Sequence, residues 1–316
     1  MEEFEQFKRA LEARDFNALK KVRKTDLHAH AYLSAGMGTY QEISPEIALP
    51  PSKFDGFGDF RAWLGKNCAL IERAGYEKVI SAAFQRMADD GIIYAEMSFD
   101  YHDCLSMGLK ITDWARLIQT QYEPYRARFA LCPEFGISRE VRPTVSQRYL
   151  EEAAETGMFR SIDLYGDELC RPASEFRNIY DLASSFGMKK KAHLGEFGQA
   201  ADIKDGVEIL GLDAVQHGVS AADNLDVMSF LRDRGTTLNI CPSSNLALGR
   251  YRSLSEHPIR RLFDHGVKLT LNSDDYMVFG AGVTDEITRL HESGIFSAKE
   301  LWQIVRAGLA ASEGRS

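Results

Sequence analysis

The stretch that decides the fold is Thr25-Asp-Leu-His-Ala-His30, a short strand-like segment that ends in two histidines. It is the first of eight such segments, which are Thr25–His30, Ile92–Phe99, Phe129–Ile137, Phe159–Tyr165, Met188–Leu194, Leu212–His217, Thr236–Cys241 and Val267–Asn272. Between most of them, apolar residues recur at helical spacing, as in Tyr76–Ala88, Ser146–Glu155 and Ile259–His265. Strands that alternate with helices favour a parallel sheet, and eight such units predict an α/β fold of the (β/α)8 barrel type.

The alternative architecture is an open, doubly wound parallel sheet, but no G-x-G-x-x-G segment follows a predicted strand. No low-complexity tract or Pro/Gly/Ser linker divides the chain, so we expect one barrel domain over residues 1–316. Phe4, Phe7 and Leu11 predict an amphipathic helix within residues 1–20. A loop rich in proline and glycine opens a lid-like segment over residues 45–67.

Composition bounds the class of protein. Hydrophobic residues make up 44% and charged residues 27% of the chain, the balance of a soluble globular protein. The formal net charge is −8 and no apolar run is long enough to span a membrane, so we expect neither a nucleic-acid polymer nor a membrane as partner. The acidic N-terminus lacks the apolar segment of a secretory signal, and the five cysteines form no CxxC pair. These features predict a cytoplasmic protein with reduced thiols, and they leave its oligomeric state open.

Imidazole and carboxylate groups lie near the ends of most predicted strands. In chain order they are His28 and His30, Glu96, Glu134, Asp163, His193, His217, Cys241 (a thiol) and Asn272–Asp275. In a (β/α)8 barrel the carboxyl ends of all strands meet at one mouth, where catalytic groups gather. We therefore expect these side chains to line a site there.

His28 and His30 lie two residues apart on a strand, so both imidazoles face the same side and can reach one metal ion. His193 closes the fifth strand, His217 ends the sixth, and the adjacent carboxylates Asp274 and Asp275 follow the eighth. Taken singly, each has a structural explanation, such as a buried histidine bonded to backbone or an aspartate that caps a helix. Together, three imidazoles and one carboxylate form a catalytic zinc ligand set with a position open for water.

Five segments carry these groups in a fixed order: His28-Ala-His30, Ser161-Ile-Asp-Leu-Tyr-Gly-Asp-Glu168, His193-Leu-Gly-Glu196, His217-Gly218 and Leu271-Asn-Ser-Asp-Asp275. In order and spacing they resemble the adenosine deaminase family of the metal-dependent aminohydrolase superfamily. The segments Gly91-Ile-Ile-Tyr-Ala-Glu96 and Cys241-Pro-Ser-Ser-Asn245 are also similar to that family, and the resemblance extends from about Lys24 to Arg306. The other zinc deaminase pattern, H-x-E with a later P-C-x-x-C, does not occur in this sequence.

The resemblance implies one zinc ion per chain, bound by His28, His30, His193 and Asp274. It implies that a hydroxide formed on zinc attacks C6 of a 6-aminopurine such as adenosine, after which ammonia leaves. Glu196 would donate a proton to N1, for which burial must raise its pKa. His217 and Asp275 would orient the hydroxide, Asp275 would also meet N7, and the Gly166 amide would meet N3.

Two positions depart from the family pattern. Tyr32 stands where an acidic residue usually contacts the ribose, and Tyr276 stands where a proline commonly follows the Asp pair. We therefore predict that the sugar end of the pocket is rebuilt, with Tyr32 as a substrate contact. Phe57 and Phe60, one helical turn apart in the lid-like segment, are either further substrate contacts or part of a core stripe.

Three functions fit these features. The leading hypothesis is a zinc-dependent deaminase of adenosine or a related 6-aminopurine, with an adenine or modified-adenine-nucleoside deaminase as its variant. A second is an amide, lactone or phosphoester hydrolase with two metals bridged by a carboxylated lysine, although Lys189–Lys191 precede His193 within the strand. A third is a non-catalytic nucleoside-binding protein, which should have lost groups such as Glu196 or His217 that are present here. The expected partner is a small purine base or nucleoside.

Overall fold

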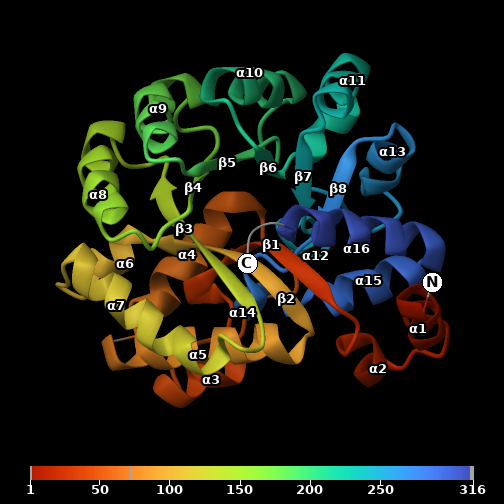
Figure 1. Cartoon of the computed structure of the whole chain (residues 1–316), viewed down its shortest axis with the longest axis horizontal. Helices are drawn as coiled ribbons and strands as arrows, with labels where there is room; N and C mark the ends of the chain where they lie inside the picture. The colour runs from red at the N-terminus through yellow and green to blue at the C-terminus, as the bar shows by residue number, and fades with distance from the viewer. Residues whose placement is uncertain (1, 72, 314–316) are drawn as a thin grey trace.

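A computed structural model describes residues 2–71 and 73–313 of the chain. Eight parallel strands pair in sequence order around one barrel (Figure 1). They are β1 Lys24–His30, β2 Ile92–Asp100, β3 Ala130–Ser138, β4 Ser161–Tyr165, β5 Lys189–Leu194, β6 Ala214–His217, β7 Thr237–Ile240 and β8 Lys268–Leu271. The predicted (β/α)8 architecture is confirmed.

The barrel closes between β1 and β8 through a few specific bonds. The Leu27 amide donates to Asn272 Oδ1 at 2.7 Å, and the Asp274 amide donates to the His28 carbonyl at 3.0 Å. Ala29 and Asp274 form an isolated parallel bridge at the same seam. Closure therefore places Asp274 beside the paired histidines of β1.

Helices surround the barrel and bury the stripes that their apolar spacing predicts. The outer helices include α5 Arg73–Asp89, α7 Ile111–Tyr122, α8 Pro143–Glu155, α9 Arg177–Ser185, α10 Ala200–Leu210, α11 Leu225–Arg234, α13 Ile259–Asp264 and α16 Ala298–Ser312. The remaining helices are α1 Glu2–Glu12, α2 Phe16–Lys20, α3 Met37–Ile43, α4 Gly56–Cys68, α6 Tyr101–Ser106, α12 Pro242–Ala247, α14 Tyr276–Phe279 and α15 Val283–Glu292, with short 3₁₀ turns Ala31–Leu33, Glu123–Tyr125, Ala173–Phe176 and Val219–Asp223.

The N-terminal segment forms two helices where the sequence predicts one within residues 1–20. Arg14 takes a left-handed conformation (φ 54°) between α1 and α2, and the Asp15 carboxylate caps α2 by accepting from the Ala18 amide. Phe7 of α1 packs against Trp302 of α16, with ring centroids 5.2 Å apart. The segment thus lies on the outside of the barrel.

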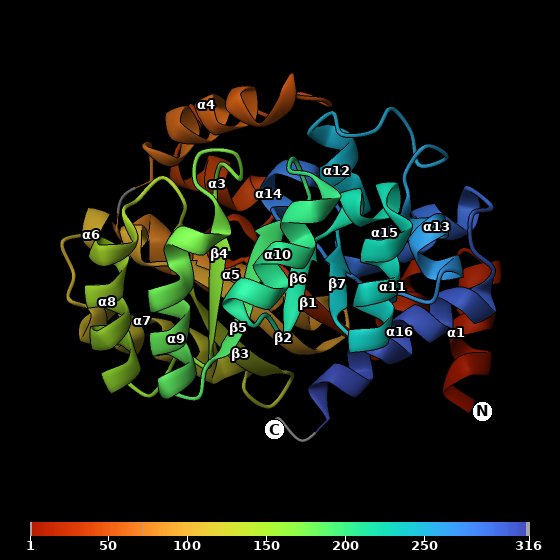
Figure 2. The same cartoon turned by 90° about the horizontal axis from the view of Figure 1, so that it is seen from above.

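Helix α4 lies across one end of the barrel, next to α12 and α14, and both chain termini lie toward the opposite end (Figure 2). The Phe54 amide donates to the Ala247 carbonyl at 2.7 Å, and the ring of Phe60 stacks on Phe279 at 5.9 Å. These contacts hold the predicted lid-like segment over the mouth.

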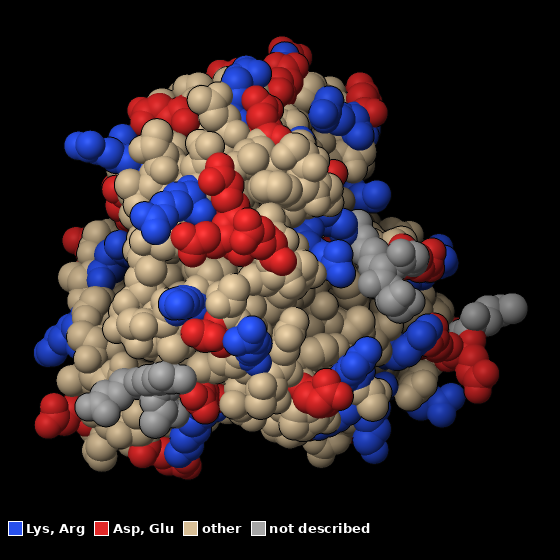
Figure 3. Space-filling view, turned by 60° about the vertical axis from the view of Figure 1, so that its left-hand side comes forward, with Lys and Arg blue, Asp and Glu red and all other residues tan. Residues whose placement is uncertain are grey.

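Within the described residues, no helix is both long and apolar enough to cross a bilayer. On the face shown in Figure 3, basic and acidic side chains are interspersed.

The prediction that Glu96 and Glu134 line the mouth is wrong. Strands β2 and β3 are nine residues long and end at Asp100 and Ser138, so both glutamates lie deeper inside the barrel. Lys191 of β5 lies between them, with its Nζ 2.5 Å from Glu96 and 2.7 Å from Glu134. The two carboxylates are therefore ion-paired within the protein.

Candidate active site

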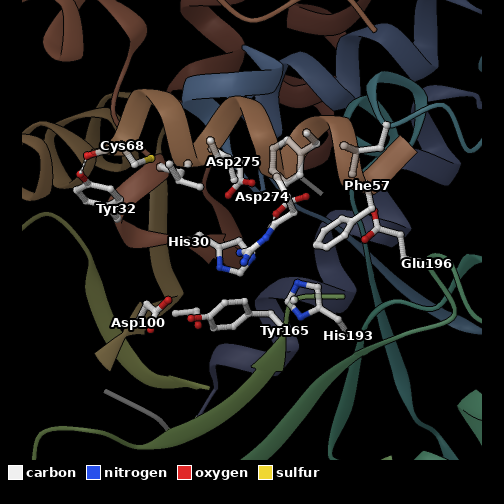
Figure 4. Close-up of a pocket in the computed structure, with 18 of the residues that line it drawn as sticks. His30, Tyr32, Phe57, Cys68, Asp100, Tyr165, His193, Glu196, Asp274 and Asp275 are labelled. Carbon is white, nitrogen blue, oxygen red and sulfur yellow. Dashed lines mark hydrogen bonds and ion pairs between the residues drawn. The ribbon is translucent and has the colours of Figure 1, made fainter. Parts of the chain in front are cut away.

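A cavity of about 300 Å³ lies at the carboxyl ends of the strands, beneath α4. Its walls include ten residues predicted from the sequence as site residues, namely His30, Tyr32, Phe57, Phe60, Gly166, His193, Glu196, His217, Asp274 and Asp275 (Figure 4). His28 lies below its floor and is fully buried. The structure thus brings the predicted residues together, while their individual roles stay predictions.

The predicted metal ligands form one cluster at the floor of this cavity. His28 and His30 present Nε2 atoms 3.3 Å and 3.5 Å from Asp274 Oδ1. The ring of His193 lies 4.6 Å from that of His28, centroid to centroid. Ligand atoms of the three histidines lie within 4.8 Å of one another, which is the separation that a single ion bridges.

The chemistry of this cluster fits a divalent metal ion. Both ring nitrogens of His28 are buried without a hydrogen-bond partner, a costly state for a polar group that a metal bond would relieve. His193 Nδ1 lies 3.1 Å from the Leu164 carbonyl, which leaves its other nitrogen for a ligand. Burial and the neighbouring His28 lower the pKa of His30 to about 4, so it offers the neutral imidazole that metals bind.

Asp274 supplies the anionic ligand. Burial raises its pKa, but the close contact with His28 and the charges of the neighbouring imidazoles outweigh burial and hold the pKa below its usual range. Cys241 also lies within reach of His28 and Asp274. Burial raises the pKa of that thiol well above its usual value, so the three imidazoles and Asp274 remain the better donor set.

Glu196 lies in the turn after β5, at the other side of the cavity from Tyr32 (Figure 4). Its carboxyl group is buried, and burial together with the charge of Asp274 raises its pKa to about 8. Glu196 Oε1 lies 3.5 Å from Nδ1 of His217, which ends β6 in a left-handed conformation. At neutral pH Glu196 is therefore a protonated acid that faces the cavity.

Two residues without a predicted role fix the orientation of these groups. His257 Nδ1 accepts from the Ile259 amide, so its Nε2 carries hydrogen and donates to Asn245 Oδ1 at 3.1 Å. That bond turns the Asn245 amide nitrogen toward Glu196 Oε1 at 3.0 Å and toward His217 Nδ1 at 3.2 Å. Since Nδ1 of His217 accepts, its hydrogen is on Nε2, which faces Asp274 at 3.9 Å.

Glu168 holds the turn that carries Glu196. Its carboxylate accepts from four successive backbone amides, those of Gly195, Glu196, Phe197 and Gly198. In the sequence, Glu168 stands out only as the last residue of the segment Ser161–Glu168 that resembles the family, and no role is predicted for it. The four amides converge because the turn folds around the carboxylate, which no spacing in the sequence reveals.

The predicted substrate contacts line the walls. Gly166 has φ +98°, and a Cβ there would lie 2.5 Å from Glu140 Oε2, so the position requires glycine and exposes backbone to the cavity. Tyr32 stacks on Tyr76 at 5.5 Å and its hydroxyl donates to the Cys68 carbonyl at 3.4 Å. Phe57 packs on Phe197 at 5.4 Å. Both phenylalanines of α4 thus join a small apolar cluster and the cavity wall together.

Asp275 and Tyr276 differ in where they point. Burial, followed by the charge of Asp274, raises the pKa of Asp275 well above its usual value, and its Oδ1 is buried without a partner. Asp275 lines the cavity. Tyr276 instead lies under the guanidinium of Arg86, 4.4 Å from the ring centroid, and is not among the lining residues. Of the two departures from the family pattern, only Tyr32 reaches the pocket wall.

Comparisons with known proteins agree with this geometry. The family model described as adenosine deaminase matches residues 45–313. An adenosine/adenine deaminase of Treponema pallidum is 28% identical over 278 residues, covering 87% of this chain and 93% of the relative.

Two solved structures share the fold. The adenine deaminase of Arthrobacter aurescens has a TM-score of 0.84 at 22% identity and covers 93% of this chain and 94% of its own. An amidohydrolase of Burkholderia ambifaria with bound Zn has a TM-score of 0.80 at 19% identity, covering 92% and 86%. The match to the family model extends over most of the barrel and includes His193, Glu196, His217 and both aspartates. The chain therefore belongs to the adenosine deaminase family of aminohydrolases.

Proposed function

We propose that this protein is a zinc-dependent deaminase of adenosine or a related 6-aminopurine. The observation that carries the proposal is the buried Glu196 carboxyl, which shares one cavity with a His/Asp cluster in which both His28 nitrogens lack a hydrogen-bond partner. Burial raises the pKa of Glu196 to about 8, which favours its protonated form. An acid and a metal cluster in one pocket are the two requirements for hydrolytic removal of an amino group from an aromatic ring. The names of the relatives, for adenosine and adenine, support the purine as substrate.

His28, His30, His193 and Asp274 would hold the ion. When bound, zinc supplies the Lewis acidity that makes water a competent nucleophile near neutral pH. A set of nitrogen and carboxylate donors suits zinc, and a solved neighbour with bound Zn has the same fold.

The residues of the chain supply the proton and the orientation. Glu196 would protonate N1 of the purine, which makes C6 more electrophilic, and it is protonated below a pKa of about 8. His217, with hydrogen on Nε2, and the neutral Asp275 would orient the attacking water. The Gly166 amide, on the cavity wall, would donate to N3. Water would replace the amino group at C6, and ammonia would leave.

Deamination of free adenine is the second candidate. It is favoured by Tyr32, a bulky neutral residue at the position where the family usually has an acid that contacts ribose. The phenol lies on the cavity wall and is bonded to Cys68. If Tyr32 fills the volume of the sugar, the free base would be preferred.

Ammonia release from a panel of purines tests the proposal. Zinc-loaded protein should release ammonia from at least one of adenosine, 2′-deoxyadenosine, adenine and a 5′-modified nucleoside, and none from cytidine. No ammonia from any purine, with zinc shown to be bound, would contradict the proposed reaction and favour a non-catalytic purine-binding role.

A further inference from the structure

Arg86 of α5 has no part in the proposed chemistry and is not among the described residues that line the cavity. Its side chain is nevertheless only 11% exposed. The guanidinium group contacts two turns that carry predicted metal ligands, one after β1 and one after β8. Arginine suits such a place because its planar group donates several hydrogen bonds in fixed directions.

On the β1 side, Arg86 fixes the turn that follows His30. Arg86 Nε donates to the Ser34 carbonyl at 2.6 Å. Ser34 is buried, and its Oγ donates back to the His30 carbonyl at 2.7 Å. Both bonds end on main-chain oxygens, so they fix the backbone of the turn. Arg86 is thus connected to a predicted ligand through one residue.

On the β8 side, Arg86 and Asp26 together hold Ser273, the residue before Asp274. Arg86 Nη2 donates to Ser273 Oγ at 3.2 Å. The buried Asp26 carboxyl group accepts from the Ser273 hydroxyl at 2.5 Å and from the Ser273 amide at 3.2 Å. Arg86 Nη2 also lies 4.0 Å from Asp26 Oδ2. Ser273 is therefore bonded through both its side chain and its backbone.

The backbone at Asp274 needs such support. Asp274 has φ +54°, in the left-handed region that residues other than glycine adopt rarely and at a cost in free energy. Such a conformation persists only where the surrounding structure fixes it. The Asp274 amide donates to the His28 carbonyl at 3.0 Å, and Arg86 holds the residue before it. In this conformation Asp274 Oδ1 lies 3.5 Å from Nε2 of His30 (Figure 4).

Tyr276 keeps Arg86 in this position. The guanidinium carbon lies 4.4 Å from the centroid of the Tyr276 ring, within the range of a cation–π contact. Tyr276 is the first residue of α14, two positions after Asp274. It departs from the family pattern, and the proposed chemistry gives it no role. Its contact with Arg86 places an aromatic ring and a cation directly beside the turn that carries Asp274.

We propose that Arg86, held by the ring of Tyr276, is a positioning residue that fixes the Asp274 carboxylate for a bound metal ion. This inference rests on the proposed function, because it takes Asp274 as a ligand of zinc. Arg86 acts through Ser273 and the backbone of Asp274, without touching the substrate. Residues that orient metal ligands in this way typically change metal affinity or activity by about 10- to 100-fold when they are mutated.

Zinc affinity and the absorption spectrum of bound cobalt(II) test this role without requiring turnover. Arg86→Met removes the guanidinium group and keeps an unbranched side chain. Competition with a chromophoric chelator should show zinc bound about 10- to 100-fold more weakly than by wild type. The visible bands of the cobalt(II)-loaded variant should shift, because they report the geometry of the ligands. Arg86→Lys, which keeps the charge and a donor group, should recover part of the affinity.

Two substitutions of Tyr276 test the contribution of its ring. Tyr276→Phe keeps the ring beside the guanidinium group and should bind zinc about as tightly as wild type. Tyr276→Leu removes the ring and should weaken zinc binding by about tenfold, the size of a partly buried cation–π contact. The matched control is Arg148→Met, because Arg148 lies over the ring of Tyr149 with its own side chain 77% exposed. This control should leave zinc affinity and the cobalt(II) bands unchanged.

Wild-type zinc affinity and unshifted cobalt(II) bands in folded Arg86→Met would overturn the positioning role, even if wild-type protein deaminates a purine. A loss of thermal stability alone would assign Arg86 to support of the barrel seam. Equal zinc affinities of Tyr276→Phe and Tyr276→Leu would overturn the role of the ring. If Arg86→Met does not fold, Arg86→Lys and Tyr276→Leu carry the same test.

Other results separate this inference from the proposed reaction. Wild-type protein that releases no ammonia from any purine, while Arg86→Met weakens zinc binding and shifts the cobalt(II) bands, would contradict the reaction and leave the role of Arg86 standing. Wild-type protein that binds neither zinc nor cobalt(II) would overturn both.

Discussion

Two clusters of ionisable residues lie one above the other in this barrel, and they are completed in different ways. In the interior, Lys191 lies 2.5 Å from Glu96 and 2.7 Å from Glu134, so the barrel supplies its own cation. At the mouth, His28, His30, His193 and Asp274 come together without any lysine or arginine among them, and His28 has no hydrogen-bond partner.

The difference leads us to expect different roles for the two clusters. A carboxylate paired with a buried ammonium is held in a fixed state, and a charge pair of this kind maintains structure. A buried imidazole without a hydrogen-bond partner, such as that of His28, is costly unless an outside cation binds it. We therefore expect mutations in the interior layer, Lys191 with its two glutamates, to lower stability. Mutations in the layer at the mouth should instead lower activity.

The largest expected effect is on turnover at the mouth. Glu196→Gln keeps the shape of the side chain but removes the acidic proton, which the carboxyl group carries at neutral pH because its pKa is raised to about 8. We expect kcat to fall by about 10³- to 10⁴-fold, the upper range for loss of a general acid, with thermal stability unchanged. Glu208→Gln, at an exposed position on α10, is the control. Turnover within tenfold of wild type would remove Glu196 from the mechanism.

The matching change in the interior should act on stability. Lys191→Met removes the cation between Glu96 and Glu134 and leaves two buried carboxylates facing each other. The free energy of unfolding should fall by about 3–5 kcal/mol, measured by urea denaturation. Lys268→Met, at an exposed position on β8, should change it little. A loss below about 1 kcal/mol would mean that the interior layer does not depend on its own cation.

The pH dependence of turnover sharpens the contrast further. Because Glu196 must be protonated to donate, and its pKa is raised to about 8, the active form dominates below that pH. We expect kcat/KM to fall about tenfold per pH unit above it. A profile that is flat from pH 7 to 10, in protein shown to stay folded, would contradict this assignment of the acid.

A smaller effect is expected from the residues that orient the acid. His257→Phe removes the donor that fixes the Asn245 amide, so Asn245 can turn away from Glu196 and His217. We expect kcat to fall about tenfold with KM nearly unchanged, the size of one lost hydrogen bond. His257→Gln, whose amide can still donate, should recover part of the rate. Equal losses in both variants would indicate a packing role only.

The sequence is informative about the barrel because β-strand and helix periodicity repeat eight times. It is also informative about His28, His30, His193, Asp274 and Glu196, since each lies at or just after a strand end and the carboxyl ends of parallel strands must meet. It misplaces Glu96 and Glu134, although the predicted ends of their strands, Phe99 and Ile137, lie within one residue of the observed ends. Both glutamates precede those ends by several residues and therefore lie inside the barrel, below its mouth.

Other parts of the site depend on contacts between loops. Asn245 lies in α12 and His257 lies twelve residues further on, beyond the end of that helix, and only the fold brings His257 onto the amide of Asn245. Asp100 and Asp103 lie beyond the predicted end of their strand, so their place in the cavity wall has no sequence signal. Arg14 breaks the expected N-terminal helix through a left-handed conformation that arginine rarely adopts.

Metal content tests the central difference between the two layers most directly. Wild-type protein, His28→Ala and Glu134→Gln are dialysed against buffer containing trace zinc and assayed by elemental mass spectrometry. We predict close to one zinc per chain in wild type and in Glu134→Gln, where only the interior layer is changed, and almost none in His28→Ala. Zinc retained by folded His28→Ala, or lost from folded Glu134→Gln, would contradict the assignment of the metal to the mouth.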